Sequence, residues 1–205
     1  MKYIITALLS CSALFSVSTA QAAVLTFDDV PGGSIQNNYG DMPTYQGFDF
    51  SGTPVSGTLD WIDVEGSGWP FGAHSGDFAL LNNFSGTGII NQSGNADFTF
   101  GGLWAKQWNT APESGGVASL LGTIRGFNNG LEVWSIDTAL NGSYQFISGQ
   151  AQVIDELHLG LGNHFLVDDI YLNQSPAAVP EPETYAMLLA GLGLVGFAAR
   201  RRKTA

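Results

Sequence analysis

The chain has a single cysteine and very little positive charge, and both shortages limit what it can do. Cys11 has no partner within the chain, so no internal disulfide is possible. Only Lys106 and Arg125 are basic between residues 23 and 179, against sixteen acidic residues, which gives that span a formal charge of −14. Such a surface repels nucleic acid and anionic lipid. We therefore expect an acidic protein that does not bind nucleic acid.

The motifs of several enzyme classes are also absent. The sequence has no G-x-S-x-G elbow and no H-E-x-x-H zinc motif. Glycoside hydrolysis needs two carboxylates that flank the scissile bond, and no pattern in the sequence pairs Glu65, Glu132 and Glu156. We predict that the protein is not an enzyme, and a hydrolase acting on exopolysaccharide is the catalytic alternative.

Residues 1–22 show the three parts of a secretory signal peptide. Lys2 is the basic part, residues 4–17 are largely apolar, and Ala-Gln-Ala at 20–22 is an A-x-A cleavage site. A membrane anchor would need a longer apolar run. The pattern predicts export through the general secretion machinery, and cleavage would remove Cys11 and with it any thiol nucleophile.

The other end of the chain is an apolar run followed by basic residues. Residues 185–199 carry no charge, and a helix of this length spans about 22 Å, against about 30 Å for a bilayer core. Long basic side chains at the end of such a helix reach toward the headgroups and close the gap. These side chains are Arg200, Arg201, Arg202 and Lys203.

An amphipathic core helix is the alternative for this run. It fits less well because the run is apolar on every face and contains three glycines, which weaken a helix in water. We predict one transmembrane helix with a basic tail at 185–205, with the basic cluster in the cytoplasm and the acidic domain outside.

Pro180, Glu181 and Pro182 precede this helix. The order of a Pro-Glu-Pro motif, an apolar helix and an Arg-rich end resembles the PEP-CTERM sorting signal of Gram-negative bacteria. The same tail has been labelled as the C-terminal domain of ice-binding proteins. The resemblance implies recognition by an exosortase, a membrane-embedded cysteine transpeptidase, and cleavage near the motif. It implies transient anchoring in the inner membrane, then delivery to the cell surface or outside the cell, and a role linked to exopolysaccharide and biofilm.

Residues 23–173 read as short strands separated by turns. Alternating polarity and many aromatic and β-branched residues predict an all-β, jelly-roll-like β-sandwich, followed by a linker at 174–184. In residues 165–172 the alternation places Asp168 and Asp169 on opposite faces. The expected strand stretches are 24–27, 47–52, 59–64, 77–82, 88–92, 96–108, 118–127, 131–140, 143–148, 154–161 and 165–173.

Three short motifs also resemble the passenger domains of PEP-CTERM proteins. They are an LTFDD strand at 25–29, a Y-x-G-F segment at 45–48 and an F-x-x-D-D-I strand at 165–170. The resemblance implies a jelly roll similar to carbohydrate-binding modules, without naming a ligand.

Two acidic pairs mark the first and last of these strands. The terminal strands of a jelly roll lie close together, so Asp28 and Asp168 are candidate ligands of one Ca²⁺, which prefers carboxylate oxygen. Only one side chain of each pair can reach a given face. The alternative is that these aspartates cap turns and keep an edge strand in solvent.

A Gly-rich stretch carries Trp69, Phe71 and His74, the candidate ligand-binding residues. An exposed Trp can stack on the apolar face of a sugar ring, and the alternative is that Trp69 closes one end of the sandwich. We expect the other tryptophans to lie in the core, because they fall in strand-like stretches. These are Trp61, Trp104, Trp108 and Trp134.

Together these features predict an exported cell-surface or matrix protein that binds exopolysaccharide. A structural matrix protein without a specific ligand is the main alternative, and the hydrolase is the third. Glycan binding that depends on Trp69 separates the first from the second.

Overall fold

The structure is a computed structural model, which describes residues 22–33, 39–53, 59–63, 72–82, 86–108, 120–162 and 164–174. The strands run from Ala23 to Leu172. Residues 1–21 of the predicted signal peptide lie outside the described residues, as do Trp69, Phe71, the Pro-Glu-Pro motif and the predicted transmembrane helix.

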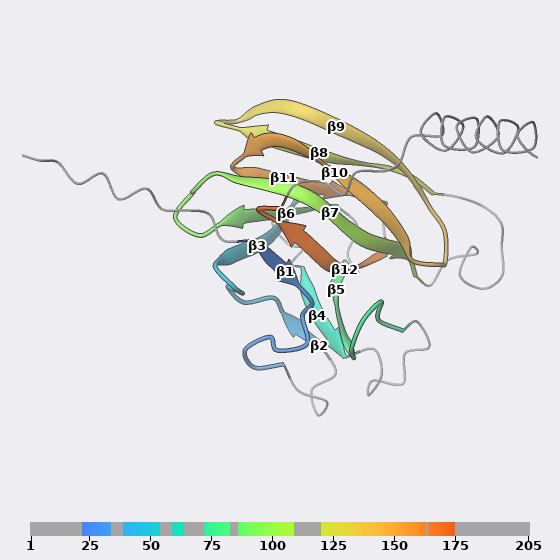
Figure 1. Cartoon of the computed structure of the whole chain (residues 1–205). Coiled ribbons are helices and arrows are strands. Elements are labelled where there is room, and N and C mark those ends of the chain that lie inside the picture. The colour runs from blue at the N-terminus through green and yellow to red at the C-terminus, as the bar shows by residue number, and fades with distance from the viewer. Residues whose placement is uncertain are drawn as a thin grey trace, which may run out of the picture.

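In the part of the chain that the structure describes, twelve strands form two antiparallel sheets that pack face to face (Figure 1). The seven-stranded sheet has the order β10-β7-β12-β5-β4-β2, with β1 paired to β12, and the five-stranded sheet has the order β3-β6-β11-β8-β9. The strands are β1 (Ala23–Leu25), β2 (Tyr39–Asp41), β3 (Phe48–Thr53), β4 (Asp60–Asp63), β5 (Phe78–Asn82), β6 (Thr87–Gln92), β7 (Phe98–Gln107), β8 (Leu120–Asn128), β9 (Leu131–Leu140), β10 (Gln145–Ile154), β11 (Glu156–Gly160) and β12 (Phe165–Leu172).

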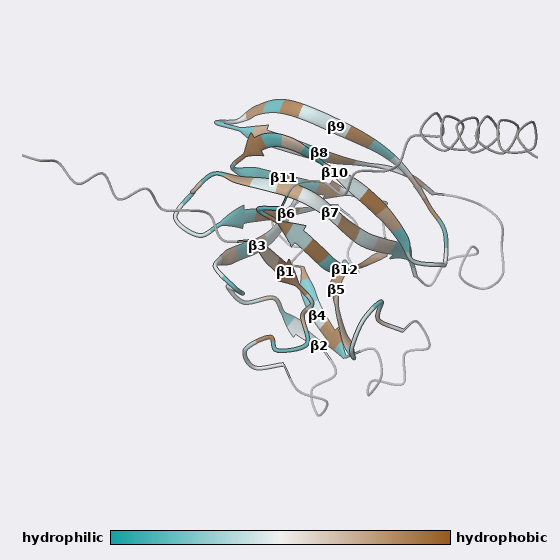
Figure 2. Ribbon diagram, in the orientation of Figure 1, coloured by the Kyte–Doolittle hydropathy of each residue, from teal (hydrophilic) through white to brown (hydrophobic). Residues whose placement is uncertain are grey.

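The core lies between the sheets because each strand turns alternate apolar side chains inward. In β11, Leu157 and Leu159 are fully buried, while His158 between them faces outward. The same alternation appears as changing hydropathy along the long strands (Figure 2). One large cluster of buried apolar residues joins both sheets.

The predicted all-β sandwich is confirmed, and each of the eleven expected stretches overlaps a strand. Strand β2 was missed because its three residues, Tyr-Gly-Asp, show no alternation of apolar side chains. The first and last strands do lie together, since Ala23 pairs with Leu172 and Leu25 with Ile170.

The predicted alternation of the last strand is wrong from Asp169 onward. A register shift in the β7–β12 pairing follows Asp168, and Asp169 has a φ of 44°. Such a bulge adds one residue to a strand and reverses the faces beyond it. Ile170 and Leu172 therefore point into the core, and the two aspartates contact the same neighbouring segment.

Among the residues described, no helix has the length and apolarity needed to cross a membrane. The predicted transmembrane segment at 185–205 falls outside them.

Candidate functional site

The segment before β5 is held against β12 by two adjacent aspartates. The backbone N–H groups of His74 and Ser75 each donate to Asp168 Oδ2, at 2.9 Å in both cases. The His74 ring contacts Asp169 Oδ2 through Nδ1 at 2.6 Å, and the Ser75 hydroxyl donates to Asp169 Oδ1 at 2.8 Å. The β12 bulge makes this possible because it brings both carboxylates to one segment.

Asp28 holds the other end of the same segment. Its Oδ1 accepts hydrogen bonds from the backbone N–H groups of Asp77 and Phe78, at 2.9 and 3.2 Å. Gly76 has a φ of 54°, and a Cβ on this residue would lie 2.1 Å from the Asp28 carboxylate. Only glycine fits here, so the Ser-Gly-Asp sequence at 75–77 is matched to Asp28.

Burial raises the pKa of Asp168 to about 7. This value includes the negative charge of Asp169, which also raises the pKa, and the backbone N–H groups of Ser75, Asp169 and His74, which lower it. The carboxyl group is fully buried, so water does not stabilise its charge. The Asp168 carboxyl group therefore changes its protonation state near neutral pH. A cation bound beside it would stabilise the charged form.

Calcium binding by Asp28 and Asp168 stays a prediction. Both carboxylates make the turn-capping contacts expected of the alternative, because each accepts backbone N–H groups. Asp29, the neighbour of Asp28, accepts a hydrogen bond of 2.5 Å from the Tyr45 hydroxyl. Within the described ranges, no three His, Cys, Asp or Glu side chains gather closely enough to hold a metal ion.

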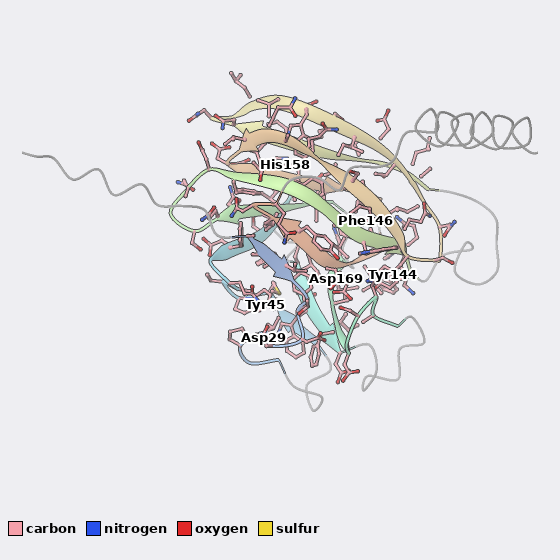
Figure 3. All side chains as sticks on the ribbon, viewed as in Figure 1. Asp29, Tyr45, Tyr144, Phe146, His158 and Asp169 are labelled. Atoms are coloured by element: carbon pink, nitrogen blue, oxygen red, sulfur yellow. The ribbon has the colours of Figure 1, made fainter. Side chains whose placement is uncertain are left out.

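A cluster of aromatic rings lies beside this segment on the outer face of the seven-stranded sheet. The His74 ring stacks on Trp104, with ring centroids 3.9 Å apart and planes 15° apart. Phe146 lies 5.4 Å from Trp104, and Tyr171 lies 5.9 Å from Phe146. Tyr144 meets the His74 ring edge-on at 5.5 Å. We call these five residues the aromatic surface, and Figure 3 shows Tyr144, Phe146 and Asp169 grouped together.

Strand pairing explains why these rings meet. Phe146 of β10 is directly opposite Trp104 of β7, and Trp104 is opposite Asp168 of β12. Leu103 and Ala105 point into the core, so Trp104 must point outward. A Cβ on Gly102 would lie 2.6 Å from the Phe146 ring, so this glycine leaves room for that ring.

The aromatic surface is only partly exposed to solvent. The Phe146 side chain is 36% exposed, and the His74 side chain 29%. The ammonium group of Lys106 lies 5.2 Å from the centroid of the Tyr144 ring, a cation–π distance. Flat apolar rings next to carboxylate oxygens are suited to a ligand that has both an apolar face and hydroxyl groups.

The sequence-based expectations for this site had different outcomes. His74 lies in the aromatic surface and contacts Asp169, while Trp69 and Phe71 lie outside the described residues. The expectation that Trp104 lies in the core is wrong, because it points outward and is only partly buried. Trp61, Trp108 and Trp134 are buried as expected.

The other rings of the surface, Tyr144, Phe146 and Tyr171, were not expected from the sequence. The alternation Tyr144, Phe146, Ser148 was a usable signal, since it places two aromatic rings on the polar side of one strand. Nothing in the sequence shows that this strand pairs with that of Trp104.

The solved structures that are similar to the chain include the following three. TmCBM61, solved in complex with β-1,4-galactotriose, is 15% identical with a TM-score of 0.33, over 62% of this chain and 88% of its own. The CBM22-1 xylan-binding domain from Paenibacillus barcinonensis is 12% identical with a TM-score of 0.41, over 76% and 95%. An arabinose-bound α-L-arabinofuranosidase is 12% identical with a TM-score of 0.43, over 74% of this chain and 26% of its own.

No curated protein matches the sequence. Residues 178–203 match the PEP-CTERM protein-sorting motif. This match contains Pro180, Glu181, Pro182 and the basic cluster, and it confirms the sorting signal expected from their order. The motif marks the chain as an exported protein.

Proposed function

We propose that this protein is an exosortase-sorted protein of the cell surface or extracellular matrix that binds exopolysaccharide through the aromatic surface. In this proposal a jelly-roll-like module at 23–173 lies between a cleaved signal peptide and a processed tail at 174–205. The tail spans the inner membrane until exosortase acts near Pro180. The observation that carries the binding proposal is the contiguous set of partly exposed rings around Trp104 and Phe146.

Sugar rings suit such a surface because their C–H faces are apolar while their edges carry hydroxyl groups. Apolar area that leaves water on binding contributes about 25 cal/mol per Å². The rings of Phe146 and Tyr171 supply that area, and the Asp169 carboxylate lies at the edge of the cluster as a hydrogen-bond acceptor. Trp69 and Phe71 precede His74 closely in the sequence, so we propose that they extend the same surface.

The aromatic surface favours binding over a purely structural role. A structural matrix protein has no need to keep apolar rings partly in solvent on a strand that also carries polar residues. Catalysis by this chain is not part of the proposal.

The test is isothermal titration of the mature protein with exopolysaccharide purified from the native host. Phe146→Ala removes a ring of the surface that is 36% exposed, so we expect at least a tenfold loss of affinity, or about 1.4 kcal/mol. Tyr39→Ala is the matched control, since this ring is 58% exposed but belongs to β2, the last strand in the order of the same sheet. Equal affinity of the Phe146→Ala variant and the parent protein would overturn the proposal.

A further inference from the structure

The outer face of the five-stranded sheet carries a regular set of polar side chains. Strand register places Gly160 of β11 opposite Thr123 of β8, and Thr123 opposite Asp137 of β9. Two residues further along each strand, His158 is opposite Arg125, and Arg125 is opposite Ser135. Residues opposite one another in a sheet share a face. Since Ile124 and Leu159 point into the core, all of these side chains point outward.

This face is hollowed into a groove. One depression of about 410 Å³ is lined at β8 and β9 by residues that include Thr123 and Asp137. A second, of about 260 Å³, is lined by Thr87, Thr123, Arg125, His158 and Gly160. The two share Thr123 and Gly160, so they are continuous. We call them together the sheet groove. It crosses β6, β11, β8 and β9, a width of about 14 Å at about 4.8 Å per strand.

The groove combines a flat ring surface with donors and acceptors. The His158 ring lies 4.3 Å from the Phe127 ring, and its Nε2 contacts Glu156 at 2.9 Å, which fixes its orientation. Arg125 lies 3.8 Å from Glu132, which is longer than a hydrogen bond, and its side chain is 48% exposed. Its guanidinium group therefore has N–H donors that can reach a ligand.

Charge selects the class of ligand. Arg125 is the one arginine between residues 23 and 179, and Asp137, Glu132 and Glu156 stand around it on the same face. A polyanion would meet these three carboxylates and the acidic domain behind them. A neutral ligand rich in hydroxyl groups meets acceptors in the carboxylates and donors in Arg125 and the threonines.

We propose that the sheet groove is a second binding site, which takes a neutral polysaccharide chain on the sheet opposite the aromatic surface. Figure 3 shows His158 in a different part of the molecule from Tyr144 and Phe146. The sheet groove shares no residue with the aromatic surface. If the aromatic surface also binds as proposed above, one domain holds two chains and links them.

The experiment is titration of the mature protein with neutral hexasaccharides of glucan, xylan, galactan and mannan, and with an oligogalacturonate as the polyanion. We expect a neutral hexasaccharide to bind, with at least a tenfold loss of affinity at one site in Arg125→Ala and in Asp137→Asn. Two variants are used so that misfolding of one, detected by circular dichroism, leaves the other to decide. Ile136→Val is the control, because it alters the inward side of the same strand at a residue that lines neither depression.

The variants separate this proposal from the preceding one. Loss in Arg125→Ala but not in Phe146→Ala supports the sheet groove alone, and loss at separate sites in both supports the linking of two chains. Loss only in Phe146→Ala overturns the second site and leaves the proposed function standing. Binding of none of the neutral hexasaccharides overturns the second site, as does binding of the oligogalacturonate alone.

Discussion

The fold excludes water from the carboxyl group of Asp168, and the stability of the protein therefore depends on pH. Its pKa rises to about 7 in the folded protein from a usual value of 3.8. Between these two values the unfolded chain has released a proton that the folded protein still holds. Stability falls with rising pH wherever the folded state binds more protons. The contribution of Asp168 is therefore fully present below about pH 4 and is lost as the pH rises to about 7.

This loss can be measured by urea unfolding between pH 4 and pH 8 in the presence of a chelator. The full effect is on the order of 4 kcal/mol, from about 1.4 kcal/mol per pKa unit. In Asp168→Asn the amide oxygen still accepts hydrogen bonds from the N–H groups of His74 and Ser75, but the side chain at position 168 no longer titrates. We expect a flatter dependence of the unfolding free energy on pH in this variant. Identical slopes in the two proteins would show that Asp168 is not the group responsible.

Calcium is a separate prediction for the same carboxylate. A cation that binds only the folded protein raises its melting temperature by mass action. If Asp28 and Asp168 share a Ca²⁺, added calcium raises the melting temperature, and more so at pH 8 than at pH 5 because Asp168 must ionise to bind it. Asp168→Asn removes the effect. A melting temperature that is unchanged by calcium and by chelation would exclude the site.

At the scale of elements, the turn before β5 depends on one glycine. Gly76→Ala places a Cβ on the Asp28 carboxylate and forces a non-glycine residue to a φ of 54°. We expect a loss of more than about 2 kcal/mol of unfolding free energy, from the clash and the strained backbone together. Gly130→Ala is the matched control, because it has a φ of 75° and nothing within 4 Å of its Cβ. We expect that variant to lose only about 1 kcal/mol.

The two variants are compared by chemical denaturation under the same conditions. Equal losses would mean that Asp28 moves freely and does not hold the segment. A larger loss in Gly76→Ala, together with weaker glycan binding, would connect the Asp28 contact to the aromatic surface through the position of His74.

The limits of prediction from sequence also lie at this scale. Strand positions followed from alternation and turn residues, because those depend on neighbours in the chain. The faces of β12 could not be predicted in this way. The bulge after Asp168 shifts the alternation, and no residue in the sequence indicates the bulge. Trp104 was expected in the core because it falls in a strand-like stretch, but an aromatic residue in a strand fits either face. Its partners His74 and Phe146 come from segments far away in the chain, which no local pattern can pair.

At the scale of the whole molecule, the ends of the domain meet. Strand β1 begins at Ala23, directly after the predicted cleavage site, and pairs with β12, which ends shortly before the sorting motif. The start of β1 and the end of β12 therefore lie side by side, since Ala23 pairs with Leu172. The described residues of the aromatic surface and the sheet groove all precede the sorting motif at 178–203, so we expect cleavage near Pro180 to leave them in the processed protein.

The most direct test is to isolate exopolysaccharide from the native host and to determine the intact mass and amount of the protein that remains attached to it. The account predicts attached protein whose mass ends near Pro180, or a heavier glycosylated form, and a much smaller attached amount for Phe146→Ala. Full-length protein retained in the inner membrane, with none on the polysaccharide, would contradict it.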